Sequence, residues 1–323
     1  METQRLNKTL NTTSVPFSMD CVKKGIGSVY RRLFEPCPIS TRDDRSFAPP
    51  LFIVGSGRSG TTLLRSILAA GGEVAIPVET HILHSLPVKF VMFNGLGWED
   101  LCRLVIATFE SHPDFYKWEI NLAPVYQKVI PLEKKNRSLA RIINEIFWEY
   151  ASQKFPEALF WGDQSPINTF YWKNIARVFP HARYIHMLRD GRDVCASLVD
   201  RYGEDYLPGA VQRWKNSIKH TTDIRKSTGS RYLEIKYEHL VTDPDTALDE
   251  ICKFLGIQFQ PQMLDFYKKS STIENRYDSF HQNIGRPLFT TSIGSWSDRL
   301  SLAQAEYVIK ELASELRKNG YME

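Results

Sequence analysis

The stretch Leu51–Ala70, LFIVGSGRSGTTLLRSILAA, decides the fold of this chain. Its first residues, Leu51–Val54, are apolar and partly β-branched or aromatic, which predicts a short buried strand. Glycine and serine crowd the next positions, Gly55–Gly60, and from Thr61 onward the leucines and isoleucine recur at helical spacing. A strand, a glycine-rich turn and a helix aim backbone N–H groups and a helix N-terminus at one point. The stretch therefore predicts an anion-binding loop in an α/β fold.

The turn differs from the phosphate loop of nucleotide triphosphatases at one position. That loop reads G-x-x-x-x-G-K-[ST], with the lysine on the β- and γ-phosphates and the hydroxyl on Mg²⁺. Gly55 and Gly60 keep the spacing, but Thr61 stands in place of the lysine, and a cation appears inside the loop at Arg58. We interpret the loop as a cradle for a terminal group less charged than a γ-phosphate, such as a phosphosulfate, without Mg²⁺. The alternative is a tight turn that binds nothing.

The residues Arg58–Leu63, RSGTTL, match the pattern [K/R]-S-G-T-T-[L/W] without a gap. In these residues the chain resembles the sulfotransferase superfamily, and the arginine form is similar to its bacterial-type and tyrosylprotein branches. The donor in that family is 3′-phosphoadenosine 5′-phosphosulfate (PAPS), and the resemblance implies that Arg58 stabilises charge on its leaving phosphate. The loop residues that the resemblance assigns to PAPS are Ser56, Gly57, Arg58, Ser59, Gly60, Thr61 and Thr62.

A second anion site is predicted at Arg189, directly after a predicted strand over Arg183–Leu188. An arginine fork with the Ser197 hydroxyl two helical turns further on suits a phosphate dianion, although a salt-linked surface turn is the alternative. The stretch Tyr184–Leu198, YIHMLRDGRDVCASL, resembles the family motif that holds the 3′-phosphate of PAPS. Tyr237 begins a Y-E-H-L sequence where the family reads Y-E-[D/Q]-L, so we expect it to contact the nucleotide, with a core tyrosine as the alternative.

Glu79 is the predicted catalytic base. Sulfuryl transfer is an in-line displacement by an acceptor hydroxyl, so a side chain must take the hydroxyl proton. Tyrosylprotein sulfotransferases are similar here, since their loop is followed at the same spacing by a catalytic glutamate in an E-T-R sequence. This chain reads E-T-H, and His81 and His84 are the fallback bases because cytosolic sulfotransferases use histidine. The alternative is that Glu79 is an ordinary solvated carboxylate.

Two positions depart from the family pattern. Gln164 stands where a lysine usually neutralises the bridging oxygen of the donor, and glutamine brings a hydrogen bond but no charge. Arg299 and Lys173 are the candidate replacements. In the C-terminal segment Ile293–Trp296, which resembles an I-G-R-W loop that closes over the donor, Ser295 replaces the arginine.

The alternation of strands and helices predicts a P-loop-like, three-layer α/β/α fold with a central, mostly parallel sheet. Ligands bind at the carboxyl ends of such strands, so the motifs can converge on one crevice. The aromatic-rich segment Ile82–Tyr126 is either a lid or acceptor pocket, or a core layer. We expect a sulfotransferase domain over 50–323 and an N-terminal extension over 1–49, with a short helix at Cys21–Phe34. The strands are expected at 51–54, 74–77, 158–161, 183–188 and 231–237.

Composition bounds the partners. The chain has 323 residues and a formal net charge of +4, which suits an anionic small molecule and does not argue for nucleic acid. Its five cysteines form no C-x-x-C pair, which argues against a disulfide framework and a zinc site. We find no apolar run of membrane-spanning length and no signal-peptide core, so we predict a cytoplasmic protein without a membrane span.

The sequence therefore predicts an enzyme that moves a sulfuryl group from PAPS to an acceptor hydroxyl, without a metal. The acceptor is a small molecule, sugar, lipid or peptide tyrosine, and the aromatic segment favours an apolar or aromatic-bearing alcohol. One alternative is a non-catalytic relative that binds PAPS or another nucleotide, which Gln164 and Ser295 favour. The other is a P-loop small-molecule kinase, which the missing lysine disfavours.

Overall fold

Parallel strands form the centre of this computed structural model, which describes residues 36–40, 48–79, 81–270 and 285–323. The five-stranded sheet has the order β2-β3-β1-β4-β5, and every pair of neighbours is parallel. The strands are β1 (Leu51–Gly55), β2 (Val74–Ala75), β3 (Phe160–Asp163), β4 (Arg183–Leu188) and β5 (Tyr232–Lys236). The predicted parallel sheet is confirmed, and the anion-binding loop leaves its central strand.

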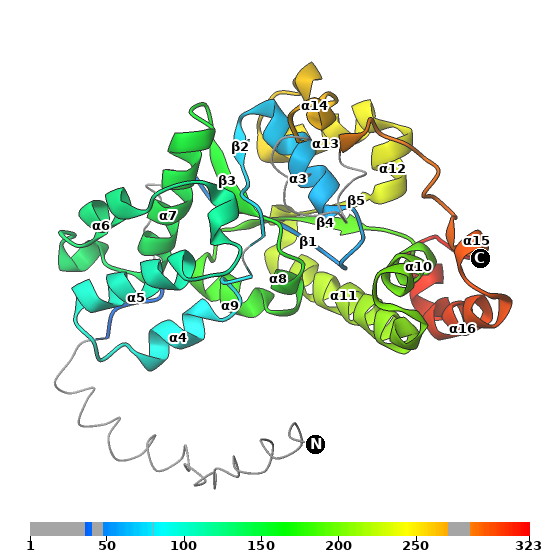
Figure 1. The fold of residues 1–323 in the computed structure, drawn as a ribbon, viewed down its shortest axis with the longest axis horizontal. Coiled ribbons are helices and arrows are strands. Elements are labelled where there is room, and N and C mark those ends of the chain that lie inside the picture. The colour runs from blue at the N-terminus through cyan, green and yellow to red at the C-terminus, as the bar shows by residue number, and fades with distance from the viewer. Residues whose placement is uncertain (1–35, 41–47, 80, 271–284) are drawn as a thin grey trace, which may run out of the picture. The chain divides into compact units, whose positions relative to one another are not determined.

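Helices cover both faces of the sheet, which gives the predicted three layers (Figure 1). On one face lie α3 (Thr61–Gly71), α12 (Tyr237–Thr242) and α13 (Pro244–Leu255), and on the other α8 (Ile167–Phe170) and α11 (Leu207–Thr228). Because side chains alternate along a strand, Ile53 packs under α3 while Phe52 stacks on Tyr184 with ring centroids 5.8 Å apart. Each fully buried apolar side chain of this kind contributes about 1.5–3 kcal/mol.

The remaining helices extend the two ends of the sheet. Beyond β5, α10 (Gly191–Tyr202), α11 and α16 (Leu302–Lys318) share a second core around Trp214. Ser301 and Gln304 form a capping box at the start of α16. The other helices are α4 (Leu86–Met92), α5 (Trp98–Glu110), α6 (Ala123–Val129), α7 (Leu139–Lys154), α9 (Trp172–Val178), α14 (Phe266–Ser270) and α15 (Trp296–Arg299).

The aromatic segment Ile82–Tyr126 is mainly a core layer. Phe109 and Trp118 are buried and pack on Phe147 of α7, with ring centroids 6.1 and 5.2 Å from it. Most of the aromatic rings pack inward because α4, α5 and α6 need a shared apolar centre of their own, whereas Phe93 and Tyr116 are exposed. The expectation that these rings favour an aromatic acceptor is therefore not supported, since none of them faces the cavity described below.

Several element boundaries differ from prediction. The helices α8 and α9 follow one another along the chain and are separated at Tyr171. The break arises because the Thr169 hydroxyl accepts from Gly55 N at 2.9 Å and donates to Gly55 O at 3.0 Å, which ties α8 to the loop. Tyr237 starts α12 instead of ending a strand. The strand predicted at 158–161 lies at Phe160–Asp163.

The N-terminal predictions fall mostly outside the described residues. This applies to the helix at Cys21–Phe34. The unit that contains the sheet runs over Pro38–Glu323. The carbonyls of Pro38 and Ile39 accept from Leu139 N and Ala140 N at 3.1 and 2.9 Å, so they satisfy donors at the start of α7. The boundary at residue 50 stays a prediction.

None of the described helices has the length and apolar character needed to cross a membrane.

Candidate active site

The loop Gly55–Gly60 turns sharply between β1 and α3, and its backbone requires unusual torsion angles. Gly60 has φ 96°, and a Cβ atom there would lie 2.6 Å from a ring carbon of Tyr237. Arg58 has φ 72°, a left-handed conformation that costs a non-glycine residue about 1–2 kcal/mol. Such strain persists where the surrounding structure enforces it, often at ligand sites. Inside the turn, Ser59 Oγ donates to Ser56 O at 2.7 Å.

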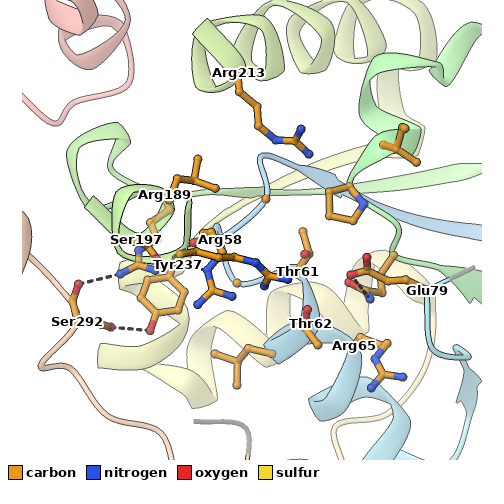
Figure 2. Close-up of a pocket in the computed structure, with 18 of the residues that line it drawn as sticks. Arg58, Thr61, Thr62, Arg65, Glu79, Arg189, Ser197, Arg213, Tyr237 and Ser292 are labelled. Atoms are coloured by element: carbon orange, nitrogen blue, oxygen red, sulfur yellow. Dashed lines mark hydrogen bonds between the residues drawn. The ribbon is translucent and has the colours of Figure 1, made fainter. Parts of the chain in front are cut away.

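One cavity of about 850 Å³ opens over this loop (Figure 2). Most of the predicted site residues line it, namely Gly57, Arg58, Gly60, Thr61, Thr62, Glu79, Arg189, Ser197 and Tyr237. Ser56 and Ser59 do not line it, because both are buried within the turn. The structure thus brings together residues from the ends of β1, β4 and β5 and from the segment after β2.

The two predicted anion sites merge into one cluster at the left of Figure 2. Arg189 donates to Arg58 O at 3.1 Å and to Ser292 O at 2.8 Å, and its guanidinium lies 4.3 Å from the centre of the Tyr237 ring. Arg58 Nε donates to Ser197 Oγ at 3.0 Å. The Arg58 side chain therefore points toward the predicted 3′-phosphate residues, although its backbone belongs to the 5′ loop.

Cationic side chains far outnumber carboxylates in the lining of the cavity. Burial lowers the pKa of Arg58, and the nearby guanidinium groups of Arg201, Arg189 and Arg299 lower it further. Like charges held this close repel one another until an anion lies between them. The cations that line the cavity are Arg58, Arg65, Lys117, Arg189, Arg201, Arg213 and Arg299, and the carboxylates are Glu79 and Asp114. The site is therefore suited to a ligand with several negative charges.

Glu79 lies at the other end of the cavity (Figure 2). Gln164 Nε2 donates to Glu79 Oε1 at 2.8 Å, and His81 Nε2 lies 3.4 Å from Glu79 Oε2. Arg65 of α3 is buried and electrostatically coupled to Glu79. A carboxylate with an oriented amide donor and a cavity in front of it can accept a proton from a bound hydroxyl.

The C-terminal segment closes the end of the cavity where Arg189 lies. Asp193 is fully buried and accepts from Gly294 N and Trp296 N, both at 2.9 Å, and from the Ser295 hydroxyl at 3.3 Å. These bonds hold the segment against the start of α10, and the Ser292 hydroxyl then meets the Tyr237 hydroxyl at 2.7 Å. Ser295 thus serves to anchor the segment that lies over Arg189.

A family model described as "Sulfotransferase family" matches residues 49–261 of this chain, which include the loop, Glu79, Arg189 and Tyr237. The chain belongs to the sulfotransferase family. Membership confirms the predicted enzyme class, sulfuryl transfer with PAPS as the donor, and removes the kinase alternative.

Individual relatives are distant. Protein-tyrosine sulfotransferase 1 of Danio rerio is 22% identical over 284 residues, which cover 84% of this chain and 72% of the relative. An omega-hydroxy-beta-dihydromenaquinone-9 sulfotransferase of Mycobacterium tuberculosis is 22% identical over 251 residues, 65% of this chain and 63% of that protein. The sulfotransferase domain of the Synechococcus PCC 7002 olefin synthase aligns with a TM-score of 0.58 at 22% identity, over 85% of this chain and 98% of that one. This last likeness supports the fold.

The sequence analysis did not identify Arg213, which lines this cavity. The Arg213 side chain extends from α11 to the loop. A Cβ atom added at Gly57 would lie 3.7 Å from Arg213 Nε. The sequence gives little indication of a functional role for Arg213, because it lies next to the core residue Trp214 in a segment that has only the pattern of a basic, amphipathic helix. Of the candidate replacement cations, Lys173 lies over Trp172 and does not line the cavity. Arg299 does line the cavity, but it pairs with Asp200 at 2.5 Å.

Asp163, at the end of β3, is expected to make the stability of the fold depend on pH. Burial raises the pKa of Asp163 to about 6, although Ser165 N donates to its Oδ1 at 2.8 Å. An unfolded aspartate loses its proton near pH 4, roughly, so between pH 4 and 6 the folded state binds more protons than the unfolded state. The free energy of unfolding therefore falls as pH rises through this window, by about 3 kcal/mol at most.

We expect Asp163→Asn to be increasingly stabilising, relative to wild type, from pH 4 to pH 7, because asparagine keeps the acceptor oxygen and never ionises. Urea unfolding of both proteins at pH 4, 5.5 and 7 measures the difference. A difference that does not change with pH contradicts the assignment of a buried, proton-binding Asp163.

Proposed function

We propose that the cavity transfers the sulfuryl group of PAPS to a hydroxyl bound at the Glu79 end, with the nucleotide bound at the Arg189 end. The observation that carries this proposal is the division of one cavity into a cluster of arginines and, opposite, a carboxylate held by an amide. Glu79 takes the hydroxyl proton as the new O–S bond forms. The loop N–H groups and the Thr61 and Thr62 hydroxyls bind the phosphate from which the sulfuryl group departs.

The residues at the nucleotide end fit a 3′-phosphate. Arg189 Nε is a buried donor with no hydrogen-bond partner within the described ranges, and the Ser197 hydroxyl lies in the same cluster. A phosphate dianion accepts from both groups and offsets the crowding of the guanidiniums around Arg58. The Tyr237 ring also lines the cavity at this position, with the Arg189 guanidinium 4.3 Å from its centre.

The departing phosphate also needs a cation, which Gln164 does not provide, because an amide is uncharged and this one already donates to Glu79. Arg213 meets this need. Its guanidinium lies beside Gly57 of the loop and 5.3 Å from the centre of the Phe170 ring. It makes no ion pair or hydrogen bond with any other residue that the structure describes, and Figure 2 shows it directed toward the loop. We infer that Arg213 replaces the usual lysine at the leaving group.

Arg213→Gln is therefore expected to lower kcat about 10- to 100-fold, since a hydrogen bond to a charged group is worth about 1.5–3 kcal/mol. Lys173→Gln is the matched control, because Lys173 is also cationic but lies outside the cavity. Steady-state transfer rates of the three proteins measure the effect. If the two variants lose rate equally, Arg213 has no special part at the leaving group.

The acceptor end combines the reactive groups with apolar walls. Val78 precedes Glu79, and Pro166 and Ile167 follow Gln164, and all three line the cavity. We propose an acceptor hydroxyl carried by an apolar or aromatic body, such as a phenol, a lipid alcohol or a peptide tyrosine. The names of the relatives, which include tyrosine and hydroxylated-menaquinone sulfotransferases, are compatible with either kind.

The test is transfer of labelled sulfate from PAPS to separate pools of tyrosyl peptides, lipid alcohols, small phenols and sugars, with EDTA present. We expect label in one of the first three pools and release of an equal amount of 3′-phosphoadenosine 5′-phosphate (PAP). Label in the sugars alone contradicts the acceptor class, and no label in any pool contradicts the proposed reaction.

A further inference from the structure

Three side chains form a connected row at the acceptor end of the cavity. Gln164 Nε2 lies 2.8 Å from Glu79 Oε1, and Glu79 Oε2 lies 3.4 Å from His81 Nε2. The amide thus holds one oxygen of the carboxylate, and the imidazole lies at the other. Both Glu79 and His81 line the cavity.

Exposure to solvent rises steadily along this row. Gln164 is 2% exposed, while the side chains of Glu79 and His81 are 23% and 44% exposed. A proton taken up by Glu79 from a bound acceptor is shielded from water on the Gln164 side. The imidazole can carry this proton to solvent, because one of its nitrogens lies beside the carboxylate and the ring is exposed.

The backbone conformation of His81 is unusual. His81 has φ 52°, which lies in the left-handed region that non-glycine residues rarely occupy. A conformation of this kind persists only where the surrounding structure enforces it, and such residues gather at functional sites. The unusual torsion directs a chemically suitable side chain back toward Glu79, two residues earlier.

We propose that His81 is a proton-relay residue that acts through Glu79, an inference that rests on the proposed sulfuryl transfer. The acceptor O–H bond breaks as the O–S bond forms, and the proton passes to Glu79. Glu79 Oε2 then passes it to the neutral His81 Nε2, and the resulting imidazolium releases a proton to bulk water. The carboxylate is thereby restored for the next acceptor, while the electron pair of the broken S–O bond leaves with PAP.

Other charged groups surround the relay, and only a neutral imidazole can accept the proton from Glu79. The titratable and charged groups around Glu79 and His81 are Arg65 on α3, His84 before α4, His112, Asp114 and Lys117 after α5, and Asp163 on β3.

The experiment compares His81→Gln with His239→Gln. His239 offers a matched control, because it also lies near a carboxylate, 3.9 Å from Asp243, and is 37% exposed, but it is outside the cavity. We expect His81→Gln to lower kcat about 10- to 100-fold and to leave PAP affinity unchanged. His239→Gln is expected to match the wild type.

Added imidazole separates a relay from a structural role. In His81→Ala, free imidazole can occupy the exposed space and is expected to restore at least half of the lost rate, with no effect on wild type or on Glu79→Gln. Full activity of His81→Gln overturns the inference. So does a loss of rate that imidazole does not restore, in a variant that still binds PAP. If the wild type transfers no sulfuryl group at all, the proposed function itself has failed.

Discussion

Glu79→Gln is expected to bind PAP as tightly as the wild type and to lose about 10²–10⁴-fold in transfer rate, the usual cost of removing a general base. The carboxylate lines the acceptor end of the cavity, away from the arginine cluster, so the substitution leaves the nucleotide contacts in place. Glutamine keeps the size of the side chain and can still bond to Gln164, which limits any structural disturbance. Calorimetry with PAP and a transfer assay on the same preparation measure both quantities.

Arg58→Ala provides the contrast, because it removes the guanidinium that donates to Ser197 within the arginine cluster. We expect that variant to lose donor affinity as well as rate. If Glu79→Gln keeps most of its activity, Glu79 is not the base. His81 is then the next candidate, since His84 packs against Tyr171, with ring centroids 5.1 Å apart, and does not line the cavity.

The sequence predicted the parts of the site that depend on local pattern. The loop at Gly55–Gly60, the strand that ends before Arg189 and the segment with Glu79 each carry their own signal within a few residues. Because parallel strands end at the same edge, the convergence of these motifs follows from the fold class alone. This is why most of the predicted residues line one cavity.

The features that sequence could not predict depend on contacts between distant segments. The break at Tyr171 follows from hydrogen bonds between Thr169 and Gly55, 114 residues apart. Arg213 becomes a site residue only because α11 packs across β1 and turns that side chain toward Gly57. No local pattern encodes either contact. The cytoplasmic location and the boundary of the N-terminal extension stay predictions.

Arg189 is expected to determine how strongly the protein prefers PAP over AMP. We predict that the wild type binds PAP about 10²–10³-fold more tightly than AMP, which lacks the 3′-phosphate. That ratio corresponds to a charged hydrogen bond from Arg189 and a weaker one from the Ser197 hydroxyl. Arg189→Ala is expected to lose most of this preference while its affinity for AMP changes little, although removal of the contacts with Arg58 O and Ser292 O also loosens the C-terminal segment.

The most direct test of the proposed nucleotide site is a calorimetric titration of the wild-type protein with PAP and with AMP in the same buffer, at one stated ionic strength. We predict that PAP binds at least 10²-fold more tightly than AMP, because the arginine cluster around Arg58 and Arg189 suits a nucleotide with phosphates at both ends of its ribose. Equal affinities for the two nucleotides would contradict it.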